Sequence, residues 1–118
     1  MRQSHGLFGR YSPTESLALF AEADLLLDSN AGVQSTGSIG FLQADFEPVQ
    51  GLHLKATGEW CDNDFSDTDA ANLRGSGTIL WFLAPHTDIR LDAMYGTLYC
   101  APGVDPTPMG MVQLHTFL

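Results

Sequence analysis

The chain has 118 residues, which is enough for one domain with a modest core and too few for two. Its formal net charge is -9 with only five Lys and Arg residues, and this excludes a nucleic-acid partner, because phosphate contacts need clustered basic side chains. Charged residues make up 16% of the chain, against about 25% in typical soluble domains, so we expect part of the outer surface not to face water.

Alternation of apolar and polar residues predicts a series of β-strands. In chain order they span roughly residues 5–11, 15–27, 35–47, 51–61, 72–84, 88–100 and 109–118. No helical periodicity interrupts them, and no run approaches the roughly 20 apolar residues of a transmembrane helix. The predicted fold is therefore all-β, a single antiparallel up-and-down meander of about seven strands over residues 1–118.

A repeat marks the connections between these strands. Pro13, Pro48 and Pro85 lie in matching surroundings, with apolar residues at even distances from each proline. Because proline fixes φ and favours tight turns, short turns are predicted at residues 12–15, 48–50 and 85–87. Longer polar loops are predicted at the segments DSNAGVQ, DNDFSDTDAAN and APGVDPTP.

The charged residues of the strands share one face. Nine of them lie at odd distances from the repeat prolines: Arg10, Glu22, Asp24, Asp45, Lys55, Glu59, Arg74, Arg90 and Asp92. Side chains alternate with a period of two along a strand, so an accidental agreement has a chance of about one in 250. The opposite face carries aliphatic residues, with Tyr11, Phe46 and Trp81 beside the short turns and Trp60 and Tyr99 at the far strand ends.

Aromatic rows that flank an aliphatic belt are typical of a wall that spans a bilayer, because amphipathic rings lie at the headgroup level. Ten strand residues tilted by about 40° rise roughly 25 Å, which matches the apolar band of an outer-membrane barrel. We therefore expect the sheet to be part of a transmembrane β-barrel, with the lipid bilayer against one face and water against the other.

The chain also resembles a known family. The hairpin PVQGLHLKA and the ending MGMVQLHTFL are similar to the C-terminal portion of Gram-negative outer-membrane porins. Val112, Leu114 and Leu118 supply the alternation expected of the last strand, although the chain ends on Leu118 and Phe117 is one place out of phase. The resemblance implies localisation in the cell outer membrane and a channel for passive diffusion of small solutes or ions.

An odd number of strands and the absence of a signal peptide suggest the C-terminal part of a larger barrel. An unclosed sheet in hydrocarbon leaves backbone groups unpaired at several kcal/mol each. We therefore expect missing N-terminal strands or other copies of the chain to close the barrel. The nine charged residues are then the predicted pore-lining residues, and because five are acidic, they favour cations mildly.

Two other functions stay open. The second is a soluble β-barrel or β-sandwich that binds a ligand, favoured by Phe20, Ile39, Phe41, Leu80 and Phe82 among the charged residues. The third is an outer-membrane hydrolase that would use His53 and His115, but the sequence has no G-x-S-x-G nucleophile motif, so no catalytic residue and no enzyme activity is predicted.

No metal or cofactor is predicted either. Asp62, Asp64, Asp67 and Asp69 lie together in one loop, but it lacks the turn glycine and distal glutamate of an EF-hand. The three methionines that follow residue 90 are expected to be packing residues: Met94, Met109 and Met111. Cys61 and Cys100 form either one disulfide or two free thiols.

Overall fold

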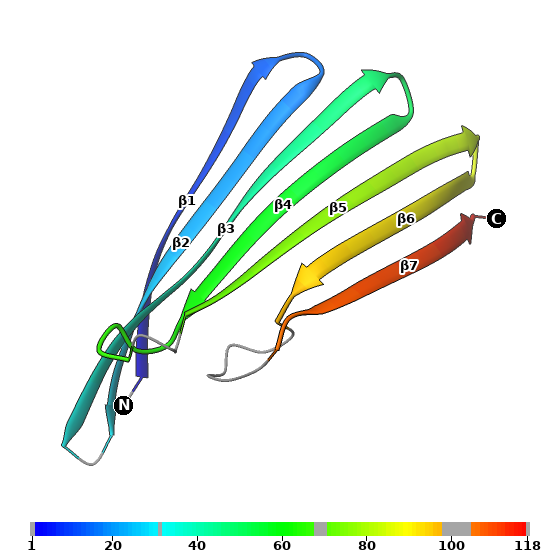
Figure 1. The fold of residues 1–118 in the computed structure, drawn as a ribbon. Helices are drawn as coiled ribbons and strands as arrows, with labels where there is room; N and C mark the ends of the chain where they lie inside the picture. Colours follow the sequence, from blue (N-terminus) through cyan, green and yellow to red (C-terminus); the bar gives the residue numbers. More distant parts are fainter. Residues whose placement is uncertain (1, 31, 68–70, 98–104, 118) are drawn as a thin grey trace.

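The computed structural model describes residues 2–30, 32–67, 71–97 and 105–117. Its strands are β1 (Arg2–Thr14), β2 (Leu17–Asn30), β3 (Val33–Val49), β4 (Leu52–Asp62), β5 (Ala71–Ala84), β6 (Thr87–Gly96) and β7 (Thr107–Thr116). They form one sheet in the order of the sequence, and every neighbouring pair is antiparallel (Figure 1). The predicted all-β meander is confirmed.

The two ends of the sheet differ in their connections. The turns that join β1 to β2, β3 to β4 and β5 to β6 lie at the same end as the C-terminus, and the N-terminus lies at the other end (Figure 1). We call the first the turn end and the second the loop end. The longer connections from β4 to β5 and from β6 to β7 lie at the loop end.

The repeat prolines lie beside the tight turns, and only one of them is inside a turn. The turns occupy residues 15–16, 50–51 and 85–86. Pro13 and Pro48 instead fall within register shifts at the ends of β1 and β3. A bulge tolerates proline because it leaves a backbone position outside the hydrogen-bond ladder, which proline cannot join as a donor.

Two predicted boundaries are wrong. The segment 28–34 is not a long loop, because β2 and β3 pair without interruption from Leu17↔Phe46 to Asn30↔Val33. Gly32, with φ +85°, allows the chain to reverse within a short connection. The sixth strand ends at Gly96 and not at residue 100. Gly96 has a φ of +148°, a backbone conformation that residues with a side chain rarely adopt. Tyr99 and Cys100 lie outside the described residues.

The sheet is open and has a single layer. In the described part of the chain β1 pairs only with β2 and β7 only with β6, so two edges have no partner strand. Leu26 is the one hydrophobic residue there that is buried. No helix among these residues is long and apolar enough to cross a membrane. The described residues therefore contain no apolar core of the kind that stabilises a soluble domain.

Candidate functional site

All nine predicted site residues lie on one face of the sheet, which we call the ion-bearing face. Directly opposite residues of antiparallel strands share a face, and the register joins several of the nine in two rows. One row runs Glu22, Phe41, Glu59, Arg74, and the other runs Asp45, Lys55, Thr78, Asp92. Arg10, Asp24 and Arg90 join the same face through their alternation with these rows.

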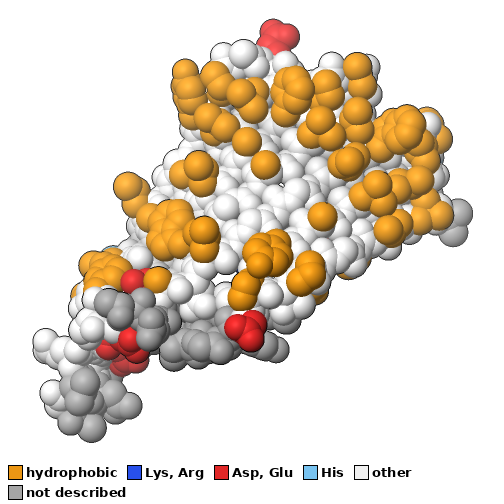
Figure 2. All heavy atoms as spheres, viewed as in Figure 1, with side chains coloured by type: hydrophobic (Ala, Val, Ile, Leu, Met, Phe, Trp, Pro, Cys, Tyr) orange, Lys and Arg blue, Asp and Glu red, His pale blue; other side chains and the backbone are white. Residues whose placement is uncertain are grey.

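The opposite face, which we call the apolar face, carries large side chains that are exposed. Its exposed members include Leu7, Tyr11, Leu25, Leu42, Phe46, Leu54, Trp60, Leu73, Ile79, Trp81, Leu91, Tyr95, Val112 and Leu114. Figure 2 shows hydrophobic side chains gathered near the turn end and again nearer the loop end, with acidic side chains only at the margins. Tyr11, Phe46 and Trp81 lie near the turn end and Trp60 near the loop end, as predicted.

Burial alternates along β4 and β5 in the sense opposite to that of a soluble protein. In β5, Asn72, Arg74 and Ser76 on the ion-bearing face are half-buried, while Leu73 and Ile79 on the apolar face are exposed. Two hollows, of about 370 Å³ and 490 Å³, are lined mainly by residues of the ion-bearing face. The burial pattern and the hollows together indicate that the ion-bearing face is the concave side of the sheet.

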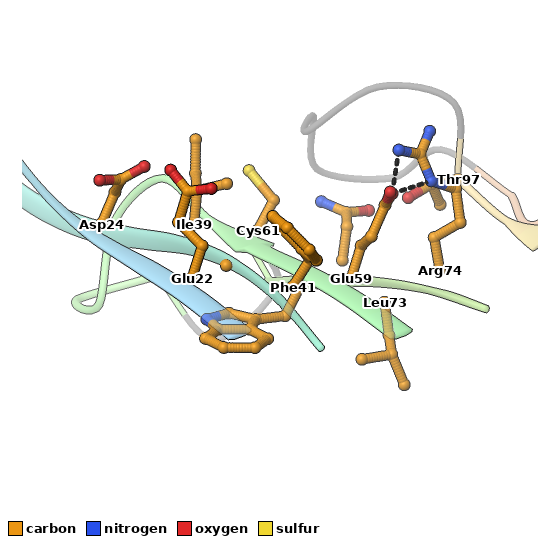
Figure 3. A pocket seen from close by; sticks show the side chains of 12 residues that line it. Glu22, Asp24, Ile39, Phe41, Glu59, Cys61, Leu73, Arg74 and Thr97 are labelled. Carbon is orange, nitrogen blue, oxygen red and sulfur yellow. Dashed lines mark hydrogen bonds and ion pairs between the residues drawn. The ribbon is translucent and has the colours of Figure 1, made fainter. Parts of the chain in front are cut away.

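The hollow nearer the loop end contains the ion pair between Glu59 and Arg74. Figure 3 shows these two side chains on the same side of the sheet as Glu22 and Asp24, with Leu73 pointing to the opposite side. The two carboxylates of β2 are accordingly separate from the guanidinium that neutralises Glu59. This wall of the hollow is acidic.

A ladder of polar contacts crosses the middle of the ion-bearing face. Asp45 contacts both Lys55, with Nζ to Oδ2 at 3.5 Å, and His53, with Nδ1 to Oδ1 at 3.1 Å. Asp92 accepts hydrogen bonds from Thr78 Oγ1 at 2.6 Å and from Arg90 Nε at 2.8 Å. Each of these buried or half-buried carboxylates therefore has a basic partner, which offsets the cost of partial desolvation.

Sequence reasoning missed Asp88, the most deeply buried charged residue that the structure describes. It is 3% exposed and pairs with His115 across β6 and β7, with Nδ1 to Oδ1 at 3.0 Å. Asp88 lies three residues after Pro85, an odd distance, so the rule that selected the other nine residues would have found it. Asp88 lies opposite Phe82 on one side and His115 on the other, and this register is what the sequence alone does not give.

Aromatic and aliphatic side chains also lie on the ion-bearing face, as the sequence indicates. The Arg10 guanidinium lies over the Phe20 ring, 5.4 Å from its centroid. The Phe82 ring meets His53 edge to face at a centroid distance of 6.3 Å. Such contacts hold long polar side chains against the sheet by cation–π and ring packing.

The acidic loop after β4 is organised by its own hydrogen bonds. Asp64 Oδ1 accepts from the Ser66 backbone N–H at 3.0 Å and from the Ser66 hydroxyl at 2.5 Å, and these bonds hold the pKa of Asp64 below its usual value. Asp62 accepts from the backbone N–H of Asp64 at 3.1 Å, and Asp69 lies outside the described residues. In that part of the chain no group of three or more His, Cys, Asp or Glu side chains is arranged to hold a metal ion.

Cys61 is disulfide-bonded, and it lies on the ion-bearing face at the loop end.

Comparison of the chain with protein-family models, curated proteins and solved structures finds no match. The two faces of the sheet are therefore the basis for an assignment of function.

Proposed function

We propose that the chain forms part of the wall of an outer-membrane pore of the porin type, with the apolar face toward lipid and the ion-bearing face toward a water-filled channel for small solutes or ions. The observation that carries this proposal is the inverted burial along β4 and β5, in which polar side chains are half-buried and large apolar side chains are exposed. In water this arrangement exposes far more apolar surface than a soluble monomer usually does. In a bilayer the same surface contacts lipid and avoids the free-energy penalty of contact with water.

A soluble ligand-binding barrel or sandwich is the second candidate, and it fits the described residues less well. Either architecture buries its apolar face beneath a second layer or inside a closed barrel. Here Leu7, Leu73 and Val112 are 79%, 75% and 74% exposed, and the hollows lie on the other face.

An outer-membrane hydrolase receives no support from the histidines. The structure pairs His53 with Asp45 and His115 with Asp88, but these histidines make no hydrogen bond to a serine hydroxyl in the described residues. Catalysis by a serine nucleophile uses such a contact, so the two pairs by themselves do not favour the hydrolase.

Closure of the proposed barrel requires further strands, and strand direction decides whether their number is odd or even. In an antiparallel meander of seven strands, β1 and β7 run the same way. Another copy in the same membrane orientation would therefore join β7 to β1 as a parallel pair. An antiparallel closure needs an odd number of additional strands, which favours strands of a longer barrel over copies of this sheet.

The proposed channel has a mild preference for cations. Five of the nine pore-lining residues are acidic, and Asp28 and Asp88 lie on the same face by their pairing. A lumen with an excess of carboxylates attracts cations and repels anions, while its water-filled cross-section admits small neutral solutes.

The proposal is tested by the behaviour of the chain in water. We expect the expressed protein to need detergent or lipid to stay dispersed and to partition into the detergent phase when micelles are separated from buffer. A monomer that stays soluble without detergent would overturn the pore proposal and favour the soluble binding module.

A further inference from the structure

Three methionines meet on the ion-bearing face where β6 and β7 pair. Met94 lies directly opposite Met109, and Met111 follows two residues later on the same face. All three line the larger hollow, of about 490 Å³. Met94 and Met109 are fifteen positions apart in the sequence, so the cluster exists only because of this register.

The surroundings of these methionines differ from those of packing residues. Met109 and Met111 are 45% and 47% exposed, and they lie among Lys55, Thr78 and Asp92 instead of on the apolar face. These neighbours are polar or charged, so a thioether packed against them gains less from burial of apolar surface than one on the apolar face. These polar surroundings leave a second role open to the three methionines besides the packing role expected from the sequence.

The spacing allows their sulfur atoms to converge. Opposite residues of an antiparallel pair have Cβ atoms about 4.5–5.5 Å apart, and residues i and i+2 of one strand are separated by roughly 6.6 Å. Methionine has three rotatable side-chain bonds, so the three sulfur atoms can approach one point above the two strands.

The local charge also suits a soft ion of low charge. Lys55 and Arg90 balance the charges of Glu59 and Asp92 among the residues that line the hollow, so it has no excess of carboxylates to attract a divalent ion. The carboxylate of Asp92, opposite Met111, already accepts hydrogen bonds from Arg90 and Thr78. One lone pair of the Met111 sulfur accepts a hydrogen bond from Gln113 Nε2 at 3.3 Å, which leaves the other available.

We propose that Met94, Met109 and Met111 form a site for a soft monovalent metal ion, Cu(I) or its chemical analogue Ag(I). Thioether sulfur is a soft ligand that selects Cu(I) over the hard ions Mg²⁺ and Ca²⁺. The site depends on the register of β6 and β7 and goes beyond the proposed pore function, so it stands or fails separately.

The test is titration of the full chain with Ag(I), which needs no reductant, in detergent and in a buffer free of chloride and thiols. We expect one Ag(I) per chain, and the combined variant Met94→Leu, Met109→Leu and Met111→Leu should weaken binding by more than about tenfold. Leucine keeps nearly the same volume, so the β-sheet content measured by circular dichroism should not change.

His115 provides the matched control, because its imidazole is a further potential Ag(I) ligand on the same face of β7 as Met109 and Met111. The variant His115→Gln should bind Ag(I) like the unaltered chain. Absence of binding, equal binding by the triple leucine variant, or loss of binding on His115→Gln would each overturn the proposed thioether site.

Discussion

Leu54 and Thr57 show how two residues on one strand meet opposite surroundings. Leu54 lies on the apolar face of β4, opposite Phe46 and Ile79, and is 38% exposed. Thr57 lies on the ion-bearing face and donates a hydrogen bond from its hydroxyl to Gln43 Oε1 at 3.4 Å. Their positions differ by three, an odd number, so their side chains point to different solvents in the proposed membrane.

The first prediction compares arginine at these two positions. Leu54→Arg should lower the free energy of unfolding in lipid by about 2–4 kcal/mol, because it places a charge in hydrocarbon. Thr57→Arg should be tolerated, since its charge would enter water beside other ions. The measurement is denaturant unfolding in lipid vesicles, and equal costs at both positions would contradict the two-faced assignment.

At the scale of the element, the β3–β4 hairpin depends on the glycine of its turn. Gly51 adopts φ +84° and donates its N–H to Glu47 Oε1 at 3.0 Å. Its carbonyl accepts from the Phe82 N–H at 2.8 Å, which ties the turn to β5. A side chain at position 51 would meet Phe82 Cβ only at 3.5 Å, so the backbone conformation, and not space, requires glycine.

The second prediction concerns this turn. Gly51→Ala should cost about 1–2 kcal/mol of unfolding free energy, because an L side chain is disfavoured at positive φ. Gly58→Ala on the same hairpin is the control and should be near neutral, since its φ is not positive and an added Cβ meets nothing within 4 Å. Denaturant unfolding checks both, and a Gly58→Ala cost as large as that of Gly51→Ala would count against this explanation.

Alternation and turn residues predicted the strands well because both are local signals. The two-residue periodicity located all seven strands and the shared face of the nine charged residues. The extension of β2 and β3 past Asp28 was missed because polar residues there resemble a loop until their pairing is known. Contacts between distant residues, such as Asp88 with His115 and Trp60 with Gly40, likewise depend on register.

At the scale of the whole molecule, the described residues form one open sheet with two chemically different faces and two edges that lack a partner strand. Its principal extents are 57 × 30 × 27 Å, and the described residues contain no second layer. The unpaired backbone groups at the edges need further strands to bond with. The two faces differ in polarity, so each suits a different solvent. The proposed pore satisfies both requirements, because a closed barrel removes the edges and separates lipid from water.

The most direct test of this account is a nitroxide scan of β4, residue by residue from position 52 to 62, with the protein assembled in lipid vesicles. Labels at 52, 54, 56, 58 and 60 should collide readily with oxygen, which dissolves in the bilayer, and labels at 53, 55, 57 and 59 with a water-soluble nickel chelate. Equal access of the nickel chelate to both sets of positions would contradict the proposed wall between lipid and water.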